Sequence, residues 1–293
     1  MSLPRVALSR RPVLKGLLAA TALAAAPGWA VAAGADPARP WTIPALREWK
    51  PRPGGFRLAA STRVVVRPGS AQRVMPVATV FGEDLSLLVG RQVPVVVVDQ
   101  PPGPGDIALD LQAIDPQLGE EGYRLLVGDA VRISAVRPAG AFYGTRSLLQ
   151  ILGQGQASVP GGEARDWPRY PERGFMIDCA RKYFTPGWLE RHVRELAFLK
   201  LNRLHLHLTD DQGFRIGSDS HPEIVSDEYL TKSEAGAIVE LAARYHITVV
   251  PEIEMPGHMG AALARHPEHR LPPDPRDTSS MRNGRLDVTS DAA

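Results

Sequence analysis

The sequence has one cysteine and little net charge. Cys179 is the single cysteine among 293 residues, so an internal disulfide is excluded. It follows a strand-like apolar segment, and free cysteines of this kind are usually buried and inert, so we expect a core thiol rather than a nucleophile. The formal net charge is only +2, and beyond the N-terminus the positive residues are scattered. This pattern gives no indication of a nucleic-acid partner.

The apolar run near the N-terminus, residues 16–26, is too short to span a bilayer. A basic segment precedes it and small residues follow it, so we expect residues 1–33 to be an export signal. Residues 9–15 (SRRPVLK) are similar to the twin-arginine export motif, with Val13 where an aromatic residue is common. An ordinary secretory signal with paired arginines is the alternative. Both predict an exported protein, periplasmic or extracellular.

The remaining chain has the composition of a globular protein and room for one or two domains. Residues 34–55 are rich in proline, alanine and arginine and are expected to be a linker. Residues 56–162 alternate between strand-like and helix-like segments, which predicts a small α/β sandwich domain without a catalytic constellation. Polar residues with two prolines at 163–171 mark the boundary of this domain. The strand-like segments are 62–67, 93–98, 107–111, 122–127 and 131–136, and the helix-like segments are 72–89 and 141–152.

A strand, a helix and a second strand follow the boundary. Residues 174–178 (GFMID) are apolar and end on a carboxylate. Thr185 is a suitable helix N-cap, Pro186 suits the first helical position, and apolar residues recur behind them at helical spacing. Residues 203–208 alternate with a period of two, and a polar turn follows at 209–213. The polar residues gather just past the carboxyl ends of the strands, where β/α barrels have their active sites.

A second helix and a third strand continue this pattern. Residues 231–234 (TKSE) form a capping box, and the helix behind them has an apolar face. Residues 248–253 are strand-like and end in the loop 255–258 (MPGH). Three such strands, of the eight in a complete barrel, predict that residues 163–293 are the first part of a (β/α)8 TIM barrel. The predicted fold class is therefore α/β, a small sandwich domain followed by an incomplete barrel.

Three motifs lie in this order across the barrel segment. They are R-G-x-x-x-D-x-x-R at 173–181, K-x-N-x-x-H-x-H-x-x-D-D-Q at 200–212, and P-E-I-E-M-P-G-H at 251–258. Together they resemble the glycoside hydrolase family 20 β-N-acetylhexosaminidases. Members of this family commonly carry a small α/β domain before the barrel, so the resemblance extends over most of the chain.

The resemblance implies an exo-acting hydrolase that removes terminal β-linked N-acetylglucosamine or N-acetylgalactosamine. Arg181 matches the arginine that holds the hydroxyls of the terminal sugar. Asp210 and His258 match a pair that supports the general acid. The substrate's own 2-acetamido oxygen is the nucleophile, and no metal or organic cofactor is implied. The Asp-Glu pair that performs this chemistry lies on a later strand in the family and has no match here, so we expect the 293 residues alone to be inactive.

The residues themselves leave alternatives open at these positions. Arg181 could instead be a surface arginine paired with Asp178 or Glu172. The period of two would put Asp211, rather than Asp210, on the side of the strand histidines. Lys182 stands where many relatives have histidine, and Glu254 stands where they often have aspartate.

Two other functions also fit the sequence. His205 and His207 form an H-x-H pattern after a barrel strand, which is a feature of metal-dependent barrel hydrolases. Packed, hydrogen-bonded interior histidines are the other interpretation of this pair. A degenerate, non-catalytic sugar-binding product is the alternative outside enzymes, because the Asp-Glu pair has no match.

Overall fold

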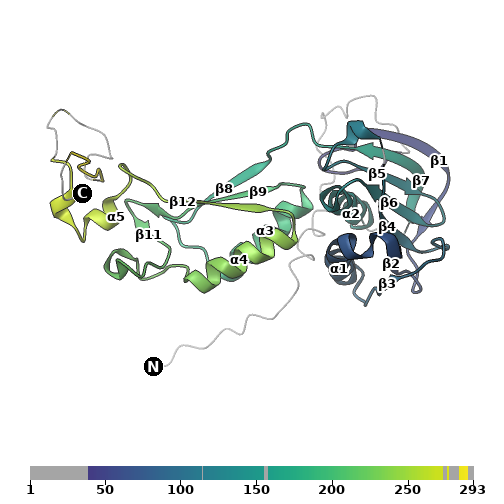
Figure 1. The fold of residues 1–293 in the computed structure, drawn as a ribbon, viewed down its shortest axis with the longest axis horizontal. Helices are drawn as coiled ribbons and strands as arrows, with labels where there is room; N and C mark the ends of the chain where they lie inside the picture. Colours follow the sequence, from purple (N-terminus) through teal and green to yellow (C-terminus); the bar gives the residue numbers. More distant parts are fainter. Residues whose placement is uncertain (1–38, 114, 155–157, 273–275, 277–283, 290–293) are drawn as a thin grey trace, which may run out of the picture.

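The computed structural model describes residues 39–113, 115–154, 158–272, 276 and 284–289. The expected export signal, residues 1–33, lies outside these ranges. Within them, no helix is both long enough and apolar enough to cross a membrane. The described residues form a seven-stranded sheet at one end of an elongated molecule and a three-stranded sheet in its middle (Figure 1).

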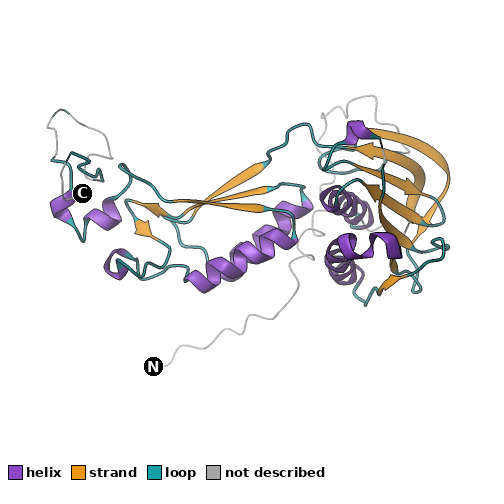
Figure 2. Cartoon of the chain, in the orientation of Figure 1, coloured by secondary structure: helices purple, strands orange, loops and turns teal. Residues whose placement is uncertain are grey.

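The seven-stranded sheet has the strand order β1-β7-β5-β6-β4-β2-β3. Strands β2, β3, β4 and β6 run parallel to one another, whereas β5, β7 and β1 are joined by antiparallel pairing. Helices α1 and α2 lie side by side on one face of the sheet (Figure 2), which confirms the predicted α/β sandwich. The bounds are β1 Glu48–Arg57, β2 Val64–Val66, α1 Pro68–Val89, β3 Val95–Val97, β4 Ile107–Leu111, β5 Tyr123–Val127, β6 Val131–Ala135, α2 Pro138–Leu152 and β7 Ser158–Asp166.

Helix α2 is enclosed on all sides. Every residue from Gly140 to Leu152 is buried, including the guanidinium-bearing Arg146. The helix packs on the sheet and on α1, and its outer side contacts α3 Pro186–Phe198 of the second domain. Arg146 pairs with Asp84 (Nη1 to Oδ2, 2.5 Å), and Tyr245 of the second domain donates to the same carboxylate (3.0 Å). The two domains therefore share one continuous core.

The predicted linker at 34–55 and the predicted boundary at 162/163 are both corrected by the structure. Strand β1 begins at Glu48 and pairs antiparallel with β7, which continues to Asp166. The prolines and glycines in both strands suggest a loop, but β1 is an edge strand, where proline is tolerated, and its register shifts between Pro51 and Gly55. Gly162 is needed in β7 because a Cβ atom there would lie 2.1 Å from the ring of Trp49.

The second domain contains the three strands predicted for the barrel. They form a parallel sheet in the order β12-β9-β8, and the two long helices of this domain follow β8 and precede β12 (Figure 2). Thr185 caps α3 by accepting from the amide of Trp188, and the capping box at 231–234 opens α4 as predicted. The bounds are β8 Gly174–Asp178, β9 Arg203–His207, β10 Thr209–Asp210, β11 Gly213–Phe214, η3 Pro222–Ile224, α4 Lys232–Arg244, β12 Thr248–Glu252, α5 Gly260–Leu263 and η4 Pro267–His269.

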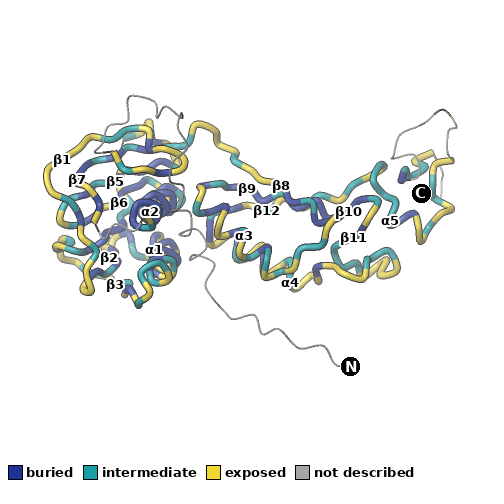
Figure 3. Tube along the Cα trace, turned by 180° about the vertical axis from the view of Figure 1, so that it is seen from behind, coloured by how far each residue is buried: buried dark blue, intermediate teal, exposed yellow. Residues whose placement is uncertain are grey.

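The parallel sheet is covered by helices on one face only among the described residues. Met176, His205 and Val250 lie in register across the three strands. Met176 is 51% exposed and Val250 is 40% exposed. In Figure 3, exposed and intermediate segments occur along this domain, whereas α2 of the first domain is dark blue. In contrast to Met176 and Val250, Leu204, one residue before His205 on β9, is completely buried. The row with His205 therefore corresponds to the face that turns toward the inside of a barrel.

Candidate active site

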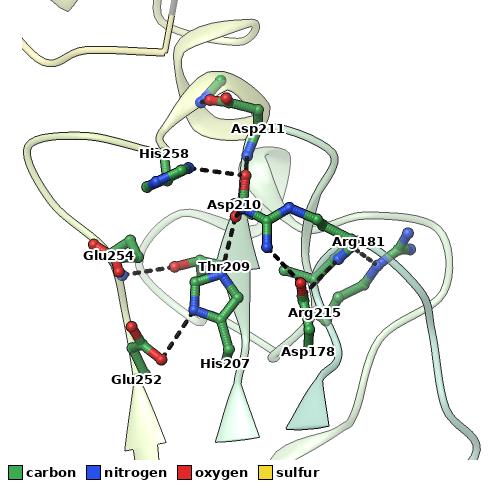
Figure 4. Close-up of polar contacts among 12 residues, drawn as sticks. Asp178, Arg181, His207, Thr209, Asp210, Asp211, Arg215, Glu252, Glu254 and His258 are labelled. Atoms are coloured by element: carbon green, nitrogen blue, oxygen red, sulfur yellow. Dashed lines mark hydrogen bonds and ion pairs between the residues drawn. The ribbon is translucent and has the colours of Figure 1, made fainter. Parts of the chain in front are cut away.

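Three polar side chains end the three parallel strands in one row. Asp178 ends β8, His207 ends β9 and Glu252 ends β12, and the strand register places each opposite the next. The Nδ1 atom of His207 lies 3.0 Å from Oε2 of Glu252 (Figure 4). Because the carboxyl ends of parallel strands meet at one edge of the sheet, these three side chains lie next to one another and begin a polar cluster there.

Asp210 lies at the centre of this cluster and is 1% exposed. It belongs to the short strand β10, which turns back through Asp211 and Gln212 to pair with β11. Its Oδ2 atom lies 3.0 Å from Nε2 of His207. The hairpin therefore brings a buried carboxylate over the strand ends, and His207 joins it to Glu252 (Figure 4).

Asp211 faces away from the strand histidines. Its Oδ1 atom accepts from the amide of Gly260, 2.9 Å away, at the start of α5. The period of two that pointed to Asp211 ends at Thr209, because the chain leaves the sheet there and enters the β10–β11 hairpin. The structure therefore places Asp210, and not Asp211, against His207.

Arg181 bridges two carboxylates at the rim of the cluster. Its Nη1 atom lies 2.5 Å from Oδ2 of Asp178, and its Nη2 atom lies 2.6 Å from Oδ2 of Asp210. The amide of Arg181 also donates to Asp178 (3.0 Å), which fixes the turn after β8. The Arg181 side chain remains 49% exposed, so part of its planar guanidinium is accessible from solvent.

His258 approaches Asp210 from the loop after β12. Its Nδ1 atom lies 3.2 Å from Oδ1 of Asp210, on the opposite side of the carboxyl group from Arg181 (Figure 4). The backbone of His258 has a positive φ of 56°, which turns the ring back toward the sheet before α5 begins. Arg181, Asp210 and His258, the three residues predicted for the site, are thus in direct contact through Asp210.

The charges around Asp210 favour its ionised form. Burial raises the pKa of the Asp210 carboxyl, but hydrogen bonds from His207 and from the amide of Asp211 counteract this effect. The charges of His258 and Arg181 add to them, so the pKa lies below its ordinary value. Burial lowers the pKa of His207, but hydrogen bonds to Asp210 and Glu252 outweigh it and raise that pKa.

A second pair of carboxyl groups, Glu252 and Glu254, lies beside the cluster. The hydrogen bond with Glu252, then burial and the charge of Glu252, raise the pKa of Glu254. Burial raises the pKa of Glu252, but hydrogen bonds with Glu254 and His207 outweigh it and lower that pKa. Of the two carboxyl groups, Glu254 therefore takes up a proton more readily than Glu252. The backbone amide of Glu254 donates to Oγ1 of Thr209 (2.8 Å).

The two strand histidines contact the same carboxylate oxygen. Nε2 of His205 lies 2.6 Å from Oε2 of Glu252, the atom that also contacts His207. His207, whose side chain is 7% exposed, matches the interpretation as a hydrogen-bonded interior histidine, whereas the side chain of His205 is 38% exposed and contacts Glu252 as an ion pair. Two groups in the site have ligand atoms close enough together to hold a metal ion, and His205 is in neither. They are His207–Glu252–Glu254 and Asp210–Asp211–His258.

His207, Glu252 and Thr209 were not among the residues predicted for the hexosaminidase site. The available signal was the row of strand-end residues, because parallel strands of known register place their last residues side by side. Cys179, also at a strand end, is buried, and burial raises the pKa of its thiol to about 12. Its prediction as a core thiol is confirmed.

Comparison with known proteins assigns both domains to one family. The family model described as glycosyl hydrolase family 20, domain 2, matches residues 39–167, and that described as its catalytic domain matches residues 170–291. A β-N-acetylhexosaminidase of Cellulomonas fimi is 38% identical over 228 residues, covering 71% of this chain and 44% of the relative. A lacto-N-biosidase of Bifidobacterium bifidum is 30% identical over 271 residues, covering 92% of this chain and 23% of the relative.

Solved structures give the same result. The family 20 β-N-acetylhexosaminidase of Streptomyces coelicolor is 33% identical with a TM-score of 0.72, covering 86% of this chain and 54% of that one. A mutant Streptomyces plicatus β-hexosaminidase in complex with its product GlcNAc is 34% identical with a TM-score of 0.72, covering 87% of this chain and 55% of that one. This chain spans about half the length of these two structures and less than half the length of the two relatives described above. With both domains matched, the chain belongs to glycosyl hydrolase family 20.

Proposed function

We propose that this chain provides the sugar-binding and acid-tuning part of an exo-acting β-N-acetylhexosaminidase site. The observation that supports this most is the convergence of Arg181 and His258 on the buried carboxylate of Asp210. The substrates are oligosaccharides or glycoconjugates with terminal β-linked N-acetylglucosamine or N-acetylgalactosamine, chitin oligomers included. The named hexosaminidases among its relatives, and the GlcNAc complex of the S. plicatus protein, support this substrate class.

Each of the three residues has a separate role in this proposal. Arg181 is half exposed and presents N–H donors in a planar fork, a geometry suited to two adjacent sugar hydroxyls. Asp178 and Asp210 hold the fork in place from behind. Asp210 and His258 orient and tune the group that protonates the leaving oxygen.

The reaction is substrate-assisted retaining hydrolysis. The 2-acetamido oxygen of the substrate attacks the anomeric carbon, the leaving oxygen takes a proton from the general acid, and water then opens the cyclic intermediate. An enzymic nucleophile is therefore not needed. The acid and the carboxylate that orients the acetamido group form an adjacent Asp-Glu pair in the family. The strand-end carboxylates described here, Asp178, Asp210, Glu252 and Glu254, include no such pair. We therefore propose that the 293 residues alone do not hydrolyse the substrate.

A fusion protein tests the proposal. Residues 39–291 would replace the matching part of the S. coelicolor enzyme, whose remaining sequence supplies the rest of the barrel. We expect the fusion to hydrolyse an aryl N-acetyl-β-glucosaminide and the Arg181→Ala fusion to be strongly impaired. The 293-residue protein should show no turnover above its own Arg181→Ala variant. A fusion with a cooperative melt but no turnover would contradict the proposed function.

The second candidate is a non-catalytic sugar-binding protein. It is favoured because the strand-end carboxylates among the described residues include no adjacent Asp-Glu pair. A binding measurement distinguishes this candidate from the proposed enzyme. Under this alternative, the 293-residue protein binds N-acetylglucosamine with an affinity that depends on Arg181, while the fusion remains inactive. Ligand-observed NMR on the wild-type and Arg181→Ala proteins measures this dependence.

The protein is exported to the periplasm or the extracellular space in this proposal, through the twin-arginine route. The support is the SRRPVLK sequence at residues 9–15. Residues 1–33 fused to a reporter should direct its export, and replacing Arg10 and Arg11 with lysine should abolish it. Export that continues in this double variant would favour the ordinary secretory signal.

A further inference from the structure

The tripeptide His-Pro-Glu occurs twice in the second domain, at 221–223 and 266–268. Each copy opens a short 3-10 helix, η3 and η4, with its histidine at the N-cap position. The histidines have nearly the same backbone angles, φ −135° and ψ 67° in the first and φ −127° and ψ 66° in the second. In each copy Nδ1 of the histidine lies close to Oε1 of the glutamate, at 2.9 Å and 3.2 Å. The repeated sequence thus builds the same turn twice.

The two turns meet through their side chains. Nε2 of His266 lies 2.9 Å from Oε1 of Glu223, the atom that also contacts Nδ1 of His221. The ring centroids of His221 and His266 are 6.0 Å apart and the rings are nearly perpendicular, at 85°. One carboxylate oxygen thus lies between two imidazole nitrogens from different turns.

The hydrogen bonds of His266 define what can lie between it and Glu223. Nδ1 of His266 faces Glu268, and Nε2 faces Glu223. In the imidazolium form both N–H groups donate to these carboxylates, whereas in the neutral form with its proton on Nδ1 the lone pair of Nε2 is directed at Glu223. Two lone pairs repel at this distance unless a proton or a cation lies between them. A carboxylate behind a histidine is also the usual partner of a metal-bound imidazole, because it fixes the tautomer and raises the basicity of the ligand nitrogen.

We propose that His221, Glu223 and His266 bind a divalent transition-metal ion of the Zn²⁺ type, through Nδ1, Oε1 and Nε2, with water as the fourth ligand. These three ligand atoms lie within 4.8 Å of one another. Zinc bonds of about 2.0–2.1 Å in a tetrahedron separate the ligand atoms by about 3.3 Å, so the present contacts of 2.9 Å need to open only slightly. Glu268 is the positioning residue behind His266.

The ion has a structural role in this proposal, separate from the hydrolysis. The first turn lies in the segment after β11, the strand that pairs with the Asp210 strand β10. The second lies after α5, which begins two residues beyond His258. A metal ion between the turns would join the two segments that flank the candidate active site. It would act alongside the hydrogen bond from Gly260 to Asp211.

Metal titration of the untagged, chelator-treated 293-residue protein tests the inference. With Zn²⁺ we expect one tight equivalent, and with Co²⁺ the strong visible absorption of a tetrahedral ion. His221→Ala and His266→Ala should each weaken binding by at least about 100-fold, since even positioning carboxylates contribute about 10- to 100-fold. Glu268→Gln should weaken it by about 10- to 100-fold. The side chain of His221 is 61% exposed, so its removal leaves the core intact.

Variants of single histidines outside the proposed metal site are the controls. His192→Ala on α3 removes a histidine that stacks on Trp188, and it should leave the metal affinity unchanged. Lack of stoichiometric binding would overturn the proposal and leave ion pairs as the contact between the turns. Binding that survives His221→Ala but is lost in His269→Gln would place the ion on the neighbouring His266–Glu268–His269 group and would also overturn it. Loss in His258→Ala alone would do the same, because the ion would then lie in the candidate active site.

Discussion

The Nη2 atom of Arg181 lies 2.6 Å from the Oδ2 atom of the buried Asp210. This contact means that the residue proposed to hold the sugar also sets the charge environment of the residue proposed to tune the acid. The two roles can be separated by substitutions that change the geometry of the arginine without changing its charge.

Arg181→Ala in the fusion protein should reduce kcat/KM by about 10- to 100-fold, the range expected for lost hydrogen bonds to a charged group. Arg181→Lys keeps a positive charge near Asp210 but lacks the planar fork, so we expect a raised KM with an unchanged acid limb of the pH profile. Steady-state kinetics between about pH 4 and about pH 8 check both. Equal kinetics for wild type and Arg181→Lys would show that the fork does not hold the substrate.

Asp210→Asn and His258→Ala should lower kcat and shift its acid limb, because both residues tune the proton donor. Asp211→Asn is the matched control. Asp211 accepts from the amide of Gly260, and the side-chain oxygen of asparagine can accept the same hydrogen bond, so this variant should leave the pH profile in place. If Asp211→Asn shifted the acid limb while Asp210→Asn did not, the assignment of Asp210 to the site would be wrong.

His207 should contribute stability that depends on pH. Its folded-state pKa lies above the ordinary 6.5, so its protonation stabilises the folded protein below that pH. The contribution is lost as the pH rises through the folded-state pKa. The difference in free energy of unfolding between wild type and His207→Gln should therefore be largest near about pH 5 and shrink toward about pH 9.

His246 provides the control of opposite sign. Burial, and then the charge of Arg146, lower the pKa of His246, so its neutral form stabilises the folded protein. The difference in free energy of unfolding between wild type and His246→Gln should decrease as the pH falls. The same pH trend in both variants would contradict the opposite directions assigned to the pKa shifts of His207 and His246.

Lys200 forms a buried ion pair between the domains. Its Nζ atom lies 2.9 Å from Oδ2 of Asp166 and 3.0 Å from the hydroxyl of Tyr123. Lys200→Met leaves the Asp166 carboxylate buried without its counter-charge, which should cost about 3–5 kcal/mol in the free energy of unfolding. The double variant with Asp166→Asn should recover part of that loss. A double variant no more stable than Lys200→Met would show that the ion pair is not the cause.

The corrected boundary of the first domain is also testable. A polypeptide of residues 46–167 contains both β1 and β7, whereas one of residues 56–162 lacks most of β1 and the end of β7. We expect the longer polypeptide to unfold cooperatively and the shorter one to aggregate, because it exposes unpaired strand edges. Thermal melts and size-exclusion chromatography measure the difference. Equal behaviour of the two would mean that β1 contributes little to the domain.

The fold was predictable wherever local pattern and tertiary environment agreed. The helix after Thr185 has a cap, a proline at its start and one apolar stripe, so the sequence and the structure coincide there. Strand β1 was not predictable, because Pro51, Gly54 and Gly55 favour a loop and only pairing with β7 makes it a strand. In the candidate site, Asp210 was identified from the motif and not from periodicity, which pointed to Asp211. Its contact with His207 depends on the β10–β11 hairpin, which the strand pattern does not encode.

The pairing of β1 with β7 has a mechanical consequence. Glu48, at the start of the first domain, lies opposite Arg165, near its end, so the chain enters and leaves this domain at the same edge of the sheet. A force that separates these two points acts across the antiparallel pair and breaks its hydrogen bonds one after another, as in unzipping, and not all at once. The first domain should therefore open under tension from its β1 edge inward, while the parallel pairs around β4 remain intact until late.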